Sequence, residues 1–185
     1  IIMLPTPNKR KKIHIRKVLC EGFKRDDNLW DIEGSLIDIK TYDFKTDYRG
    51  EVNSGTAIHN MSIRITLDDN LLIKDINVSM DNHPYETCPA ILKNFKKLVG
   101  ITIGRGFRKN VYSKVGGISG CTHLVELLFP IATTAFQTIY SYKAFKSKNK
   151  KSNNSNQPLL INTCHSWREN GEVIEKYFPK FYKNK

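Results

Sequence analysis

Residues 57 to 68, AIHNMSIRITLD, alternate apolar and polar side chains with few exceptions. A period of two over this length is typical of a β-strand with one buried face. Asp68, Asp69 and Asn70 then predict a tight turn, after which residues 71–81 repeat the alternation. The two segments therefore predict an antiparallel pair of strands. The expected inward face of the first strand consists of Ala57, His59, Met61, Ile63, Ile65 and Leu67.

Two earlier segments also alternate. They are 12–23, KIHIRKVLCEGF, and 29–44, LWDIEGSLIDIKTYDF, in which Gly34 is an expected bulge or close approach. Four sequential strands with short connections predict an antiparallel, meander-like sheet with one solvent-facing side. The expected apolar positions are Ile13 and Ile15, then Val18 and Cys20 after a slip, in the first segment, and Trp30, Ile32, Leu36, Tyr42 and Phe44 in the second.

The second half of the chain has the period of helices. The segment 88–100, CPAILKNFKKLVG, has apolar residues at helical spacing with Pro89 in its first turn, and a short helix is expected over 107–115. The segment that follows, GGISGCTHLVELLFPIATTAFQTIYSYKAF, predicts the longest helix, with a kink at Pro130. Strands followed by helices predict an α+β fold, with the sheet packed against the helices. The expected buried stripe of the long helix is Leu124, Leu127, Leu128, Ile131, Ala135 and Ile139.

The chain has the length of one domain with tails, at 185 residues. Residues 146–157, KSKNKKSNNSNQ, are polar and low in complexity, and they predict a disordered loop. Ordered structure is expected to return at 158–178. We therefore expect a single α+β domain over 13–178, with basic tails at 1–12 and 179–185.

The sequence also indicates the cellular environment. It has no stretch of 18 apolar residues, which excludes a membrane-spanning helix. Its first residues do not resemble a signal peptide, because the basic residues follow the apolar ones. Four cysteines scattered along a chain of this length do not form a disulfide scaffold and indicate a reducing compartment. We therefore expect a cytoplasmic protein with no membrane partner.

The net charge of +12 suggests a nucleic-acid partner, but much of the positive charge lies in three segments. Residues 1–19 carry six basic residues, 143–151 five and 176–185 four, with no acidic residue in any of them. These 15 of the 30 basic residues leave 15 against all 18 acidic residues, so the remainder is slightly acidic. Arginine and aromatic residues do not interleave as on a nucleic-acid-binding face. We therefore expect solvated lysine tails, and nucleic acid is an unlikely partner.

Glycines precede the long helix. In GGISGCTH, Gly117 and Gly120 lie just before a helix N-terminus, where free N–H groups and the helix dipole favour an anion. The alternative is turn geometry alone, because neither the phosphate loop nor the dinucleotide fingerprint is present. Cys121 is a candidate nucleophile, because the dipole favours its thiolate. The alternative is a small buried residue.

His123 and Glu126 are three residues apart and so share a helix face, which suits an acid–base pair or two metal ligands. A second cysteine–histidine pair, Cys164 and His165, follows the polar run. We expect both pairs to converge on one pocket. His123, Glu126 and His165 are therefore the candidate ligands of zinc or another divalent metal, although no CxxC or HxxxH spacing supports a metal.

Two further residues are candidates for binding. His59 lies on the expected inward face of its strand, where the alternative is a hydrogen-bonded core histidine. Arg25 belongs to a polar cluster at a strand junction, where the alternative is a charged turn. The other members of that cluster are Asp26, Asp27, Trp30 and Glu33.

Several segments together resemble a bacterial family known as domain of unknown function 2889. They are LCEGFKRDDNLWDIEGSLIDIKTYDF, IHNMSIRITLDDNLLIKD, CPAI, GGISGCTHLVELLFPIATTAFQTI and TCHSW, and the resemblance covers residues 13 to about 178. It implies no particular reaction, and it associates the chain with acyl-CoA and aromatic-acid catabolism through neighbouring genes. Asn162 stands where the family pattern DTCH has aspartate, which implies a weaker role there if that aspartate orients a histidine.

These residues lead to one hypothesis and two alternatives. We expect a small metabolic enzyme, a hydrolase or lyase, that acts on an anionic organic acid or its acyl thioester through a Cys/His/Glu site. The first alternative is a non-catalytic module that binds a small acidic ligand. The second is a nucleic-acid-associated protein that uses its lysine tails. The expected catalytic residues are Cys121, His123, Glu126, Cys164 and His165.

Overall fold

The computed structural model describes residues 4–147 and 160–184. The chain forms two compact units, residues 1–145 and residues 146–185. The predicted disordered loop at 146–157 falls almost entirely outside the described residues. The single domain over 13–178 therefore stays a prediction. None of the helices in the described parts of the chain is both long and apolar enough to cross a membrane.

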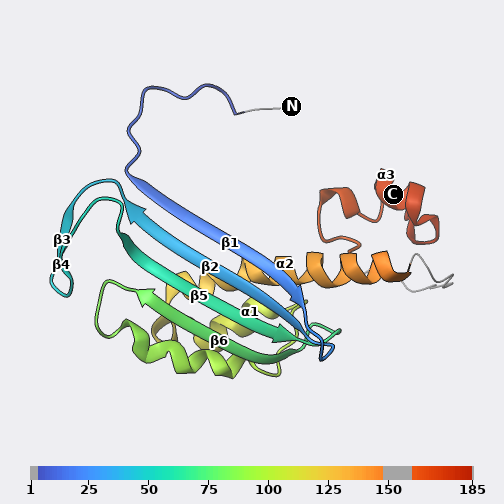
Figure 1. The fold of residues 1–185 in the computed structure, drawn as a ribbon. Helices are drawn as coiled ribbons and strands as arrows, with labels where there is room; N and C mark the ends of the chain where they lie inside the picture. Colours follow the sequence, from blue (N-terminus) through green and yellow to red (C-terminus); the bar gives the residue numbers. More distant parts are fainter. Residues whose placement is uncertain (1–3, 148–159, 185) are drawn as a thin grey trace. The chain divides into compact units, whose positions relative to one another are not determined.

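A four-stranded antiparallel sheet forms the front of the first unit, with the strand order β1-β2-β5-β6 (Figure 1). A two-stranded hairpin, β3 and β4, is inserted between β2 and β5. The predicted α+β fold with a meander-like sheet is confirmed, and the hairpin is an addition to it. Phe44 belongs to this hairpin and not to the phase of β2. The strands are β1 (His14–Lys24), β2 (Trp30–Lys40), β3 (Phe44–Thr46), β4 (Gly50–Val52), β5 (Ala57–Leu67) and β6 (Ile73–Asn82).

The helices that follow the sheet within the first unit cover one face of it (Figure 1). The segment that begins at Cys88 is a run of 3-10 turns, with a proline in its first turn. The short helix has the predicted bounds, and the long helix continues through Pro130. These elements are η1 (Cys88–Leu98), α1 (Phe107–Val115), η2 (Gly117–Ser119) and α2 (Thr122–Ser147), followed in the second unit by η3 (His165–Trp167), α3 (Glu172–Tyr177) and η4 (Pro179–Phe181).

Helix α2 packs along the sheet through the predicted apolar stripe. All six residues of that stripe are at most 1% exposed. The close approach depends on Gly34 in β2, because a Cβ atom there would lie 2.5 Å from the side chain of Ile131. On the neighbouring strand, a Cβ atom at Gly22 would collide with Thr138. The prediction that Gly34 marks a close approach is therefore confirmed, and α2 lies over both β1 and β2.

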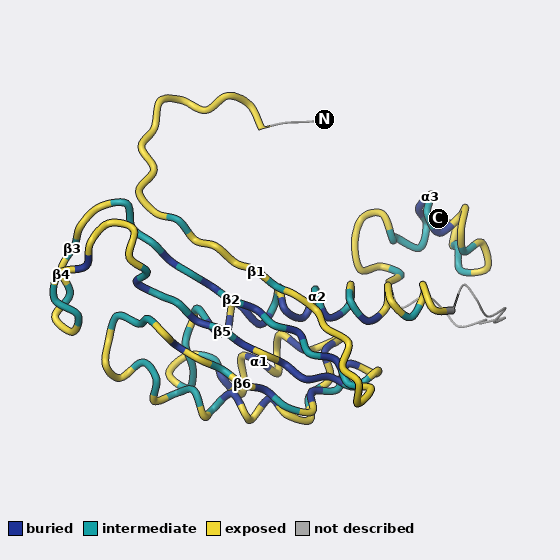
Figure 2. The backbone as a smooth tube through the Cα atoms, viewed as in Figure 1, coloured by how far each residue is buried: buried dark blue, intermediate teal, exposed yellow. Residues whose placement is uncertain are grey.

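Strand β1 has a different phase from the predicted one. It pairs with β2 from His14 to Lys24 without a register shift, so the expected slip is wrong. The helix-facing side of β1 therefore includes His14 and Arg16 together with Val18 and Cys20, and the isoleucine at 15 faces the other way. Figure 2 shows that β1 is exposed along most of its length, whereas β2 alternates between buried and partly buried residues and β5 is mostly buried or partly buried.

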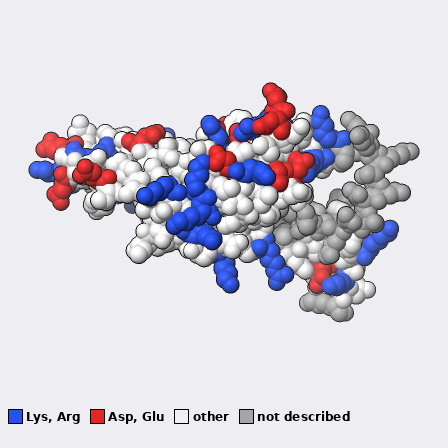
Figure 3. Space-filling model, turned by 90° about the horizontal axis from the view of Figure 1, so that it is seen from below, with Lys and Arg blue, Asp and Glu red and all other residues white. Residues whose placement is uncertain are grey.

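A basic stretch lies within the first unit as well as at its ends. Residues 88–116, which form η1 and α1, carry seven basic residues and no acidic one. Figure 3 shows Lys and Arg side chains gathered in the middle of the face that is seen from below. The total charge outside the three basic segments is slightly negative, as expected. Within that part of the chain, however, residues 88–116 are basic.

Candidate functional site

A row of polar side chains crosses three strands at one end of the sheet. Arg16 of β1 is the register partner of Asp38 of β2, and Asp38 is the register partner of His59 of β5. Asp38 has the same phase as the buried Trp30, Ile32 and Leu36, so its side chain points toward the helices. Cross-strand partners have side chains on the same face of a sheet. The row therefore lies between the sheet and the beginning of α2.

Asp38 is only 1% exposed and accepts several hydrogen bonds. Arg16 donates Nε–H to Oδ1 at 2.7 Å and Nη2–H to Oδ2 at 2.6 Å. His14 Nε2 lies 3.1 Å from Oδ1, and His59 Nδ1 lies 3.0 Å from Oδ2. Burial alone raises the pKa of Asp38, but the hydrogen bonds and charge of Arg16 and the two histidines lower it from 3.8 to about 2. Asp38 is therefore a buried carboxylate that stays ionised.

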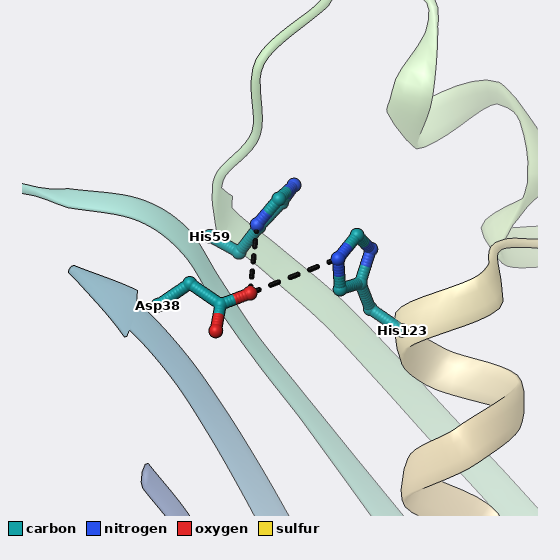
Figure 4. A group of neighbouring side chains, drawn as sticks. All are labelled: Asp38, His59 and His123. Atoms are coloured by element: carbon teal, nitrogen blue, oxygen red, sulfur yellow. Dashed lines mark hydrogen bonds and ion pairs between the residues drawn. The ribbon is translucent and has the colours of Figure 1, made fainter. Parts of the chain in front are cut away.

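His123, from the first turn of α2, completes the group. Its Nε2 lies 3.7 Å from Asp38 Oδ2, and its ring lies 3.9 Å from the ring of His59, centroid to centroid (Figure 4). Burial lowers the pKa of both histidines below 6.5, and for His123 the neighbouring His59 and Arg16 lower it further. Both rings are therefore favoured in the neutral form near neutral pH.

The ionised carboxylate favours one tautomer of each ring. A carboxylate only accepts hydrogen bonds, so His59 Nδ1, at 3.0 Å from Asp38, carries the proton. His123 Nε2 lies further away, at 3.7 Å, where the negative charge of Asp38 favours a proton on that nitrogen. In this tautomer of neutral His123, Nδ1 is an acceptor. Cys121 Sγ lies 3.7 Å from this Nδ1, on the other side of the ring from Asp38. The arrangement Cys121, His123, Asp38 can pass a proton from the thiol to the imidazole.

Cys121 is held at the start of α2. Its carbonyl accepts the first helical hydrogen bond, from Val125 N–H at 2.9 Å. The glycines before it serve the turn: Gly117 has a φ of 56°, and a Cβ atom at Gly120 would collide with the carbonyl of Val115. These two glycines are thus explained by backbone geometry, and the predicted role of the loop in anion binding stays a prediction.

Asp38, His59 and His123 also form a possible metal-binding set. Each offers one ligand atom, and the three atoms lie within 4.8 Å of one another. Two histidines and one carboxylate are a donor set that zinc and other divalent transition metals accept. Against a metal, Arg16 already donates to both oxygens of Asp38 and places a positive charge beside them.

Of the predicted catalytic residues, the structure brings together Cys121 and His123. It adds His59, predicted as a binding residue, to the same group. Glu126 does not join them: its side chain is exposed and accepts a hydrogen bond of 3.0 Å from the hydroxyl of Tyr112. Glu126 therefore interacts with α1, although it is only three residues from His123.

Cys164 and His165 belong to the second unit. Cys164 is exposed, and His165 Nε2 lies 2.9 Å from Nη1 of Arg168. Their convergence with His123 stays a prediction. Asn162 has a φ of 62°, and its side-chain oxygen accepts a hydrogen bond from the backbone N–H of Glu169. At this position the side chain stabilises a local turn.

Arg25 lies just after the end of β1, at the opposite end of this strand from His14 and Arg16. Its guanidinium is paired with Asp27 at 2.6 Å and with Asp31 at 3.3 Å. The structure therefore does not bring Arg25 to the Asp38 group, and a separate binding role for it stays a prediction.

Three members of this group were not predicted from the sequence: His14, Arg16 and Asp38. One signal was present: Asp38 stands two residues after Leu36, in the phase of an otherwise apolar inward face. An acidic residue in that phase must find a buried partner. The partner, Arg16, is visible only once the pairing of β1 and β2 is known.

A family model described as "Protein of unknown function (DUF2889)" matches residues 14–137. This range contains the whole group around Asp38 as well as Cys121. A search of curated proteins and a search of solved structures each gave no match.

Proposed function

The chain belongs to the DUF2889 family, whose description gives no reaction, and from the Asp38 group we propose that it is a small hydrolase. It cleaves an ester or thioester of an anionic organic acid, with Cys121 as the nucleophile. The observation that carries this proposal is the order of contacts: Cys121 Sγ to His123 Nδ1 at 3.7 Å, and His123 Nε2 to Asp38 Oδ2 at 3.7 Å. A nucleophile, a base and a group that orients the base are the parts that such catalysis requires.

Each residue has a defined role in this reaction. His123 Nδ1 accepts the thiol proton of Cys121, and the thiolate attacks the acyl carbonyl carbon. When the tetrahedral intermediate collapses, His123 returns the proton to the leaving alcohol or thiol, and an acyl-cysteine thioester remains. Water, deprotonated by His123, then attacks this thioester, releases the acid and restores the thiol. Asp38 holds the Nε2–H tautomer of His123 and stabilises the imidazolium.

The beginning of α2 supplies the site for the developing oxyanion. The first acceptor in this helix is the carbonyl of Cys121, so the N–H groups of Thr122, His123 and Leu124 have no acceptor in the preceding turn. Such N–H groups stabilise a tetrahedral oxyanion. These N–H groups directly follow Cys121 in the chain, so they are close to the carbonyl group that its thiolate would attack.

An acyl group that carries its own carboxylate is supported by the positive charge beside Cys121, His123 and Asp38. The side chains of Arg16 and His14 are 42% and 43% exposed, although both contact the buried Asp38. Arg16 uses Nε and Nη2 for Asp38, and the remaining N–H groups of its guanidinium are directed away from that carboxylate. A substrate carboxylate therefore finds a cation there.

The test uses nitrophenyl esters and aryl thioesters of mono- and dicarboxylic acids, with release of the leaving group as the signal. We expect Cys121→Ser and His123→Ala to lower kcat/KM by about a hundredfold or more with the fold intact. Cys88→Ser is the matched control, because that thiol lies outside the group, and it keeps full activity. Peptide mapping after acid quenching locates the acyl group on Cys121. Full activity in Cys121→Ser would rule out the nucleophilic mechanism.

A second candidate function, metal-assisted hydrolysis, is favoured by the 4.8 Å spacing of the ligand atoms of Asp38, His59 and His123. Treatment with EDTA followed by gel filtration separates the two mechanisms. A cysteine hydrolase keeps its activity after this treatment, and added Zn²⁺ inhibits it because the metal occupies His123. A metal-dependent hydrolase loses activity and recovers it when the metal is returned.

A further inference from the structure

Strand β1 forms one edge of the sheet and, within the described residues, pairs on one side only, with β2. Its eleven residues run without a bulge. Exposed edges of this length and regularity pair readily with another strand unless charges, prolines or bulges prevent it. Three apolar side chains are exposed along it: Val18 at 46%, Leu19 at 58% and Phe23 at 45%. The edge is thus exposed (Figure 2) and partly apolar.

The charges on the solvent-facing side of the sheet are unbalanced at this edge. Glu21 of β1 is the register partner of Glu33 of β2, so two like charges lie directly opposite each other. On the other side of Glu33, Arg64 of β5 donates to it at 2.6 Å. Among the described residues, neither Glu21 nor Lys17 has an ion-pair partner. The row Glu21, Glu33 and Arg64 therefore has two negative charges and one positive charge. A second positive charge could lie beside Glu21, on the side where no strand pairs with β1.

We propose that two copies of this chain associate through their β1 strands, antiparallel and with Leu19 at the twofold axis. In this register, Lys17 lies opposite the partner's Glu21, and Glu21 lies opposite the partner's Lys17. Ile15 likewise lies opposite the partner's Phe23, and the two Leu19 side chains meet. Each Glu21 thereby gains the positive charge that its row lacks. A surface that is complementary to itself about one axis is the condition for a twofold dimer.

The helical layer is compatible with this pairing. Helix α2 lies over both β1 and β2, because Thr138 packs on Gly22 and Ile131 on Gly34. With strands about 4.8 Å apart, the two α2 helices of such a dimer lie about 10 Å from each other. This is the ordinary spacing of packed helices. Arg16 lies opposite the partner's Gly22, on which the partner's Thr138 packs. The proposed dimer is argued from the edge and the charges of β1 and does not depend on the proposed hydrolase activity.

The test measures the mass of the full chain by sedimentation velocity and light scattering over a range of concentrations. We expect a dimer that Glu21→Lys and Lys17→Glu each weaken by about tenfold or more, because each sets like charges opposite each other twice. The double variant K17E/E21K restores pairing, because the two charges have merely changed places. Glu21→Lys also removes the repulsion with Glu33, so the monomer is expected to keep its melting temperature.

Lys74→Glu is the matched control, since it changes an exposed lysine on β6, at the other edge of the sheet, and we expect it to leave the dimer intact. Leu19→Lys sets two like charges at the axis and should give a monomer. A wild-type chain that is monomeric at every concentration would overturn the proposal. So would a dimer that is indifferent to both charge reversals, or single reversals that are not rescued by the double variant.

Discussion

Arg16 donates one hydrogen bond to each carboxylate oxygen of Asp38, and the two residues are direct neighbours across the β1–β2 pair. This bidentate contact fixes the plane of the carboxylate. His59 and His123 then approach the same oxygen, Oδ2. The guanidinium thus sets the position to which both rings are oriented, although it is itself partly exposed.

Replacing Arg16 by alanine should destabilise the fold. Asp38 would remain buried without its strongest donor, and its pKa would rise. Loss of one partner of a fully buried pair costs about 3–5 kcal/mol, and the partial exposure of Arg16 reduces this to about 2 kcal/mol. Urea unfolding measures the change. Arg64→Ala, which breaks the exposed pair with Glu33, is the control and should cost less than about 1 kcal/mol.

The stability of the protein should fall in mild acid. The pKa values of His59 and His123 are lower in the folded state than the ordinary 6.5, so the unfolded chain binds protons first as the pH drops. Their contribution is present above pH 6.5 and is lost as the pH falls through the folded-state values. Urea unfolding in EDTA from about pH 8 to about pH 5 measures this slope. The double variant H59N/H123N should flatten it.

His83 serves as the control for that experiment, because it stacks on Tyr48 and lies outside the Asp38 group. H83N should leave the slope as it is in the wild type. An unchanged slope in H59N/H123N would mean that other groups cause the loss of stability in acid.

The two histidines should differ in their effect on hydrolysis. His123→Ala removes the base, and we expect a loss of about a hundredfold or more in kcat/KM. His59 contacts Asp38 and the ring of His123, whereas the contact with Cys121 is made by His123. His59→Ala should therefore shift Asp38 and His123 slightly and lower kcat/KM only about tenfold. Equal losses in both variants, together with equal losses of melting temperature, would instead favour a structural role for the pair.

Gly34 should not tolerate a side chain. A Cβ atom there lies 2.5 Å from Ile131, and overpacking of this kind costs about 1–3 kcal/mol. Ile131→Val in the background of Gly34→Ala should recover part of the loss, because the two positions share one space. Gly104→Ala is the control: no atom lies within 4 Å of its Cβ position. Thermal and urea unfolding measure the stability of these variants.

The parts of the fold that follow from local pattern were predicted from the sequence. The alternation in β5 and the stripe from Leu124 to Ile139 each depend on residues within one element. The structure confirms the stripe and the inward face of β5 from His59 to Leu67. Ala57, also predicted on that face, lies beyond the bulge and pairs with Ile39, so it has the opposite phase. The phase of β1 was wrong because its helix-facing side is polar where it meets Asp38. An apolar pattern cannot identify a buried face whose residues are His14 and Arg16.

The candidate site was predicted where its residues are close in the sequence, and His59 was predicted singly from the phase of its strand. Cys121 and His123 are two residues apart, and they were found. Arg16, Asp38 and His59 are joined by strand register over more than twenty residues each way, and such pairing has no local signal. Nearness in the sequence also suggested His123 as the partner of Glu126, whereas in the structure the hydroxyl of Tyr112 donates to Glu126.

The pairing of β2 with β5 shifts between Asp38 and Ile39, where Ile58 has no partner. The row that contains Asp38 and His59 is therefore the last one in the regular ladder. Insertions or deletions beyond it, in the hairpin β3–β4, leave the phase of that row unchanged, because the ladder from Trp30 to Asp38 already sets it. The insertion or deletion of one residue inside that ladder would turn the side chain of Asp38 to the solvent. Length variation in this fold is thus tolerated on one side of Ile58 and forbidden on the other.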